Sequence, residues 1–434
     1  MPSRLALPKS LQPPRPKPRA MGMFLLFSLA FVLFSLGLWQ RMEGPGRDNL
    51  PFLLIFAGAL ILAVILGGLY WSSVANPDAS LLEPILAATL ASGTALSGLF
   101  YLVLPRGGLG AASGGAGLYL LPLLFFPGFF LLAAAPPFLW ALAFPEEKGT
   151  GRGLFTLASV SFLSLALALA GSSLWEKVYP PARFFLADLG FLLLLSLALW
   201  LWCTKAPRDA EEIPLRFFPV KSLGSWTGDK IYGQEVLVSP RAKKTLHLAA
   251  FLGAAAAGGL LLSRASLKVP WEETRLFETG ILAAVSLGLG SLLLGPLLAR
   301  LTLPMLSVAL NQLIMSVLLL SPSPTGSEGT AGLIFSLAPL VCCGALPPLA
   351  LRVGVSRHDF LAYSIGKMNA RLAAGFFLGL CLGALFLLKG PPGRLDAASG
   401  LLSLFSAFMA AGPTLSWPLT VILTAVAGLL LYIL

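Results

Sequence analysis

The chain has 434 residues, of which 57% are hydrophobic and only 11% are charged, and its formal net charge is +11. A soluble domain carries about 25% charged residues, and a water-soluble core cannot bury this much apolar surface. The composition therefore excludes a soluble globular protein and indicates an integral membrane protein. In a membrane protein, basic residues set orientation and contact anionic headgroups, so the positive charge does not indicate nucleic-acid binding.

Residues 1–20 form a basic, proline-rich segment that contains no acidic residue. Its four closely spaced prolines oppose a helix, so we expect a disordered cytoplasmic tail before an uncleaved first span. A signal peptide is the alternative, because a basic stretch followed by an apolar one is typical of both.

Six apolar stretches follow the tail, and several reach the roughly 20 residues that cross a bilayer. They cover residues 21–39, 51–71, 81–104, 117–144, 153–174 and 184–203. The fourth stretch contains Pro122, Pro127 and the pair Pro136-Pro137. Prolines inside a helix kink it, so this span is either a broken helix beside a substrate path or a kinked packing helix.

A polar, basic segment at residues 204–245 separates these spans from a second group. The second group covers about 246–263, 277–299, 301–320, 331–351 and 361–388, followed by a region 397–434 that Gly412-Pro413 interrupts. We therefore predict an all-α polytopic protein with about twelve spans, thirteen being the alternative. Its N-terminal bundle is expected at 21–203 and its C-terminal bundle at 246–434, joined by a cytoplasmic linker.

Six predicted spans separate the tail from the linker, so both lie on the same side of the membrane, and this side carries more lysine and arginine than the other. The basic side is normally cytoplasmic, so we expect a cytoplasmic N-terminus, in the inner membrane of a bacterium.

Polar residues inside two spans are the candidate substrate-binding residues. Asn311 and Gln312 lie near the middle of the ninth span, where amides either bond across helices or contact a substrate. Lys367, Asn369 and Arg371 lie near the start of the eleventh span. Lys367 and Arg371 are four residues apart and share a helix face, so they either anchor to headgroups or line the mouth of a pathway for anions.

The eleventh span also carries glycines at a spacing of four residues. Gly375, Gly379 and Gly383 lie on one helix face. Small residues at this spacing let two helix backbones approach closely, so these three positions predict a tight helix–helix contact.

We find no P-loop, no HExxH motif and no nucleophile-elbow serine, so an enzyme is not expected. The four cysteines show no CxxC spacing, and the two histidines are too few for an intramembrane haem. We therefore expect no cofactor and no metal.

The overall plan of six spans, a basic loop and six more spans resembles the major facilitator superfamily. Residues 346–388 add to this likeness through PPLALR, a short polar turn and SIGKMNARLAAGFFLGLCLGALFL. The same stretch is also similar to the membrane part of spermidine-synthase-like proteins. The resemblance implies two six-helix bundles around a central path, but no binding residue can be carried over from either family.

The function predicted from these features is secondary transport of a small organic solute by alternating access within the lipid bilayer. The alternative is a non-transporting integral membrane subunit or scaffold of a multi-protein complex. A transporter requires a polar cleft between its halves, whereas a scaffold does not. The sequence identifies neither the solute nor a coupling ion.

Overall fold

The computed structural model describes residues 50–74, 126–131, 150–176, 240–266, 273–300, 304–321, 330–354, 361–389 and 392–412. Nearly all of these residues are helical, and no strand occurs among them. The basic tail, the linker before Pro240 and the predicted spans at 21–39, 81–104, 184–203 and 415–434 lie outside the described residues.

The described part of the N-terminal half consists of two long helices and a short helical segment. α2 (Leu50–Val74) and α6 (Thr150–Glu176) cover the predicted spans 51–71 and 153–174. Residues 126–131 are helical and lie inside the proline-containing fourth span. The ring of Phe130 in this segment lies 5.8 Å from the ring of Tyr70, so the segment packs against α2.

The C-terminal half supplies most of the described residues. Its elements are α8 (Pro240–Ser266), α9 (Glu273–Leu289), η3 (Gly290–Leu294), α10 (Gly295–Ala299), α11 (Pro304–Leu320), α12 (Thr330–Gly354), α13 (Leu361–Lys389) and α14 (Pro392–Ala411). α8 begins before the boundary expected at residue 246, and α14 begins before residue 397. Both helices therefore begin earlier in the chain than the apolar runs that predicted them, because polar residues extend their N-terminal ends.

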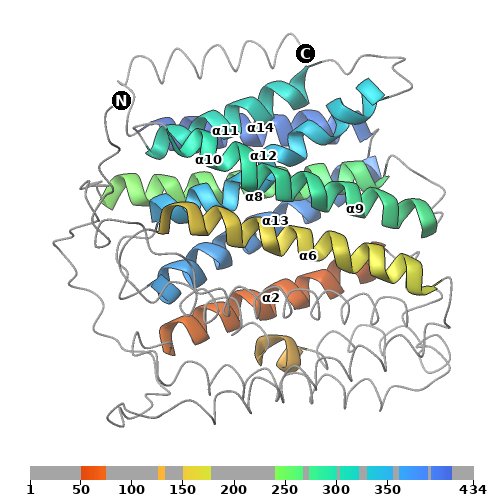
Figure 1. The fold of residues 1–434 in the computed structure, drawn as a ribbon, viewed down its shortest axis with the longest axis horizontal. Helices are drawn as coiled ribbons and strands as arrows, with labels where there is room; N and C mark the ends of the chain where they lie inside the picture. The colour runs from red at the N-terminus through yellow and green to blue at the C-terminus, as the bar shows by residue number, and fades with distance from the viewer. Residues whose placement is uncertain are drawn as a thin grey trace, which may run out of the picture.

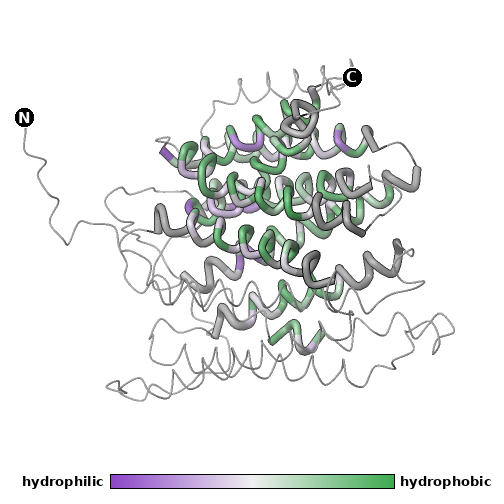
Figure 2. The backbone as a smooth tube through the Cα atoms, turned by 45° about the vertical axis from the view of Figure 1, so that its right-hand side comes forward, coloured by the Kyte–Doolittle hydropathy of each residue, from purple (hydrophilic) through white to green (hydrophobic). Residues whose placement is uncertain are grey.

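Three described helices are long and apolar enough to cross a membrane by length and composition. Their apolar windows are Lys244–Ser263, Gly280–Ala299 and Gly366–Leu385. Five shorter apolar stretches lie in α2, α6, α11, α12 and α14. Figure 2 shows that hydrophobic residues predominate along the described helices. In lipid, a helix satisfies its own backbone groups, which explains why the spans fold this way.

The described helices of the two halves lie side by side and pack in pairs (Figure 1). Across the halves, α2 packs against α13, and α6 packs against the α9–η3–α10 helix and α12. Within the C-terminal half, α8 packs against α12, α13 and α14, while α11 packs against α12 and α14.

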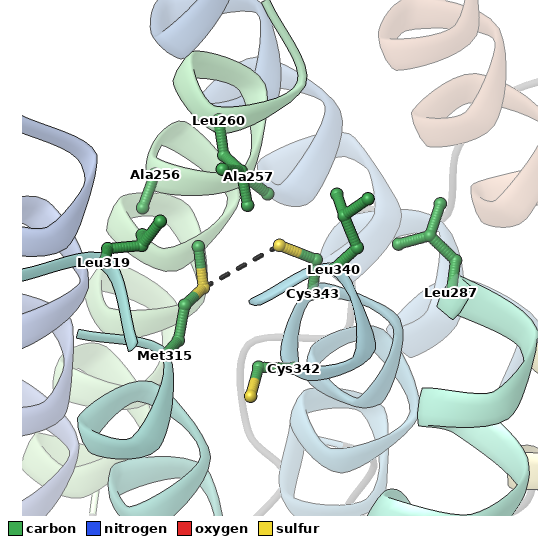
Figure 3. Close-up of a cluster of buried hydrophobic side chains, with 9 residues drawn as sticks. All are labelled: Ala256, Ala257, Leu260, Leu287, Met315, Leu319, Leu340, Cys342 and Cys343. Atoms are coloured by element: carbon green, nitrogen blue, oxygen red, sulfur yellow. Dashed lines mark hydrogen bonds between the residues drawn. The ribbon is translucent and has the colours of Figure 1, made fainter. Parts of the chain in front are cut away.

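The core of the C-terminal half is built from small and flexible apolar side chains of four helices. Figure 3 shows this cluster, in which the Cys343 thiol lies 3.7 Å from Met315 Sδ between α12 and α11. α8 contributes Ala256, Ala257 and Leu260 to the same cluster. Small residues on α8 let three neighbouring helices approach it closely, which explains its central position.

α9, η3 and α10 form one continuous span that contains a π turn. Pro296 lies just after this turn, near the start of α10. Because proline has no N–H, the carbonyl of Leu292 cannot receive the usual α-helical bond from residue 296. A π turn is a common way to accommodate such an interruption without ending the helix.

Candidate functional site

The junction between α6 and the α9–η3–α10 helix is the most extensively described contact between the halves. The Ser159 hydroxyl donates a hydrogen bond of 3.1 Å to the carbonyl of Gly288. At one end of the junction, a Cβ atom added to Gly295 would lie 2.6 Å from Phe155 Cδ1. At the other end, the Cβ position of Gly280 lies 3.1 Å from Leu169 Cδ1. Side chains of α6 therefore pack against glycines of α9 and α10 at several positions along the helix.

α2 and α13 form a second junction between the halves. A Cβ atom on Gly58 of α2 would lie 2.7 Å from Phe377 Cζ of α13. Here, as between α6 and α9, an apolar side chain of one half packs against a glycine of the other.

The predicted residues Lys367, Asn369 and Arg371 lie in α13, the helix that contacts both α2 and α8. All three are partly buried. Their helix thus lies at the boundary between the halves.

Asn311 is fully buried in α11 and bonds to a neighbouring helix. Its Nδ2 donates a hydrogen bond of 3.0 Å to the carbonyl of Cys342 in α12. Its Oδ1 is buried and has no hydrogen-bond partner among the residues that the structure describes. Of the two alternatives for this amide, the bond across helices is the one the structure contains, and a substrate contact stays a prediction.

Gln312 is also fully buried, but it faces a different pair of helices. The Ser403 hydroxyl of α14 lies 2.9 Å from Gln312 Oε1 and 2.8 Å from the Gln312 carbonyl. A Cβ atom on Gly253 of α8 would lie 2.9 Å from the same amide. The two adjacent amides are therefore not brought together: one joins α11 to α12, and the other lies among α8, α11 and α14.

The three spaced glycines of α13 lie against α8. A Cβ atom on Gly375 would overlap the carbonyl oxygen of Phe251, and one on Gly379 would overlap that of Ala255. Gly383 lies one turn further, where its Cβ position is 3.5 Å from the Cα atom of Gly259. Gly383 also borders a pocket of about 360 Å³ between α8, α13 and α14. This pocket is lined almost entirely by apolar residues of the C-terminal half, so it differs from a polar cleft between halves.

Sequence reasoning missed Ser159 and Ser291, both of which are buried and bond to carbonyls of other helices. Serine inside an apolar span is common, and nothing in its sequence spacing distinguishes these two from serines such as Ser286, which bonds to its own helix. Arg352 at the end of α12 was also not singled out, and its Nη1 donates to the carbonyl of Ala299 at the end of α10. Within the described residues, no group of three or more potential metal ligands occurs.

No protein-family model and no curated protein matches the sequence. Solved structures do match. The human organic anion transporter MFSD10 (TETRAN) aligns with 90% of this chain and 97% of its own, with a TM-score of 0.61 and 14% identity. A bacterial homologue of the iron transporter ferroportin, in an outward-facing state, aligns with 91% of this chain and 96% of its own, with a TM-score of 0.60 and 13% identity. The major facilitator superfamily transporter FucP gives a TM-score of 0.48 at 16% identity, too low to support an argument.

These similarities confirm the predicted fold class, because the first two matched chains are aligned over nearly their whole length. The chain is a multi-pass helical membrane protein with the fold of these two solved structures.

Proposed function

We propose that this protein is a secondary transporter that moves a small organic solute by alternating access. The observation that carries this proposal is the way the halves meet. In a fold shared with an organic anion transporter, the described junctions between α6 and α9 and between α2 and α13 are helix pairs in which side chains of one half pack against glycines of the other. Such contacts separate without breaking a backbone contact, which suits two bundles that rock against each other.

The experiment that tests alternation uses cysteines at the two ends of the α6 junction. In a chain whose four natural cysteines are replaced by alanine, Leu169→Cys and Gly280→Cys form a disulfide that keeps one end closed. A third cysteine, Phe155→Cys, reports the other end through its rate of reaction with a bulky maleimide. Alternating access predicts that the disulfide raises the reaction rate at residue 155, and reduction restores it. An unchanged rate would favour the non-transporting scaffold.

For the solute, we propose an organic anion that contacts α13. Support comes from Lys367 and Arg371, two cations on one face of a helix at the boundary between the halves. The similarity to an organic anion transporter is consistent with this class. Carboxylates pair with such cations, so an anion of suitable size gains from both charges.

A thermal-shift screen of organic carboxylates, each compared with its neutral amide, tests the solute class. A carboxylate that raises the Tm of the purified protein should lose this effect in Lys367→Gln and Arg371→Gln, while its amide has none. Equal stabilisation of the parent protein and both variants would exclude these residues as the anion site. Asn369→Ala tests the third candidate residue of α13. Asn369 lies between the two cations in the sequence and carries no charge.

A further inference from the structure

α12 contains a proline pair in its interior, and this pair removes two backbone donors. Pro347 and Pro348 both lie inside the helix. In an α-helix, the N–H of residue i bonds to the carbonyl of residue i−4, so these prolines leave the carbonyls of Cys343 and Gly344 without their usual partners. Both residues are buried, and an unsatisfied carbonyl inside a membrane protein is costly.

One of these carbonyls receives its hydrogen bond from another helix. The Ser291 hydroxyl, fully buried in the π turn η3, donates to the carbonyl of Gly344 at 2.6 Å. Pro348 has no N–H and cannot donate a hydrogen bond to this carbonyl. The backbones approach closely enough because both sides carry glycine: a Cβ atom on Gly290 would overlap the Val341 carbonyl, and one on Gly344 would overlap that of Leu287.

A second side chain holds α12 from its opposite neighbour. Asn311 of α11 donates to the carbonyl of Cys342. This carbonyl is one residue before that of Cys343, which lacks its intrahelical donor because of Pro347. The interrupted stretch of α12 is therefore held by two side chains from two different helices.

The same π turn lies at the junction between the halves. Ser159 and Phe155 of α6 contact Gly288 and Gly295, the residues that flank η3 on either side. A movement of α6 that displaces Ser159 and Phe155 therefore acts on the element that carries Ser291.

We propose that Ser291 and Asn311 are positioning residues that set the bend of α12 at Pro347-Pro348, and that Ser291 couples this bend to the movement of α6 between the halves. This proposal rests on the alternating-access function proposed above. In the cycle, η3 and the adjacent stretch of α12 shift together, because their backbones are in direct contact. The Ser291 bond to Gly344 differs in strength between the two states, and α12 changes its bend at Pro347-Pro348 while Asn311 holds the carbonyl of Cys342.

The first test asks whether Ser291 serves the carbonyl that Pro348 leaves free. Pro348→Ala restores an N–H that can bond to Gly344 within the helix. Ser291→Ala should therefore lower the Tm clearly in the parent protein and much less in the Pro348→Ala background. Ser291→Thr keeps a hydroxyl and should retain most of the stability. Additive effects of Ser291→Ala and Pro348→Ala would overturn the assignment.

The matched control is Ser286→Ala. Ser286 is a buried serine in the same span, and its hydroxyl donates at 2.8 Å to the carbonyl of Leu282 in its own helix. Its loss should produce no dependence on residue 348.

The second test uses the maleimide reaction rates at residues 155 and 169, measured in separate single-cysteine proteins well below the Tm. Ser291→Ala should change the ratio of the two rates about fivefold, the effect of one ordinary hydrogen bond on a two-state equilibrium. Ser286→Ala should leave the ratio unchanged, because its bond does not join the moving elements. Should Ser291→Ala fail to fold, Pro348→Ala replaces it, because its N–H satisfies the Gly344 carbonyl within α12 and competes with the Ser291 bond. Pro348→Ala should then shift the ratio relative to the parent protein, and an unchanged ratio would overturn the coupling role of Ser291.

The two tests separate failure of this proposal from failure of the transport function. If the disulfide between residues 169 and 280 leaves the rate at residue 155 unchanged in the parent protein, alternating access itself fails. If that rate responds but Ser291→Ala shifts the ratio no more than Ser286→Ala, the transport proposal stands and the coupling role of Ser291 is wrong.

Discussion

The contact between α8 and α13 differs in kind from the contact between α6 and α9. Within the C-terminal half, α13 places Gly375 and Gly379 directly against backbone carbonyls of α8. Across the halves, Gly288 and Gly295 face the side chains of Leu163 and Phe155 instead. A backbone contact tolerates almost no displacement, whereas a side chain can change rotamer and follow a moving partner. The difference indicates that α8 and α13 move as one body, while α6 and α9 can slide.

The largest effect should come from adding one methyl group to the backbone contact. Gly379→Ala places a Cβ atom on the Ala255 carbonyl, and neither helix backbone can yield locally. We expect a loss of about 3 kcal/mol, at the upper end of the range for overpacking. This loss of unfolding free energy is measured by unfolding the purified protein in a series of denaturing detergent concentrations. A loss as small as that of an exposed substitution would show that α8 and α13 are not packed as described.

A smaller loss is expected where the contact within the half is a hydrogen bond. Asn311→Ala removes the donor to the Cys342 carbonyl, which should cost about 1–3 kcal/mol because both groups are buried. The same unfolding assay applies, with Ser321→Ala as the control, since the exposed Ser321 hydroxyl only bonds to its own helix. If Asn311→Ala unfolds like the parent protein but abolishes solute binding, the residue serves the substrate instead of the fold.

Across the halves, the added methyl group should cost less. Gly295→Ala moves the Phe155 ring, which can rotate away, so we expect a loss of about 1 kcal/mol. Phe155→Leu shortens the opposing side chain and makes room for the added methyl group. The double variant Gly295→Ala/Phe155→Leu should therefore lose less stability than the sum of the two single variants. A loss equal to that of Gly379→Ala would remove the distinction between the two kinds of contact.

The smallest effect is expected at a glycine that contacts no neighbour among the described residues. No atom of that part of the structure lies within 4 Å of a Cβ position on Gly68 of α2. Gly68→Ala should therefore be neutral or raise stability by about 0.5–1 kcal/mol through helix propensity. A clear destabilisation, seen in the same assay, would mean that another part of the chain packs there.

The long, strongly apolar elements were predictable because their signal is local. The apolar runs at 51–71, 153–174 and 361–388 correspond to α2, α6 and α13. The ends were less predictable: α8 begins at Pro240, inside the charged segment, because polar residues continue a helix beyond the bilayer. The candidate site was predictable only in residue type. Asn311 and Gln312 stand out in an apolar span, but their sequence could not show that they face different helices.

The amino-acid sequence by itself determined that this chain is a multi-pass helical membrane protein, because a backbone in lipid must satisfy its own hydrogen bonds. The sequence also determined where a second helix backbone can approach closely, because Gly375 and Gly379 place no side chain on that face of their helix. Only the tertiary structure decided that α2 meets α13, that α6 meets α9, and that Ser291 serves the carbonyl freed by Pro348. A helix that is apolar on all sides carries no periodic pattern to identify its partners, and a hydroxyl's acceptor depends on which backbone the fold brings beside it.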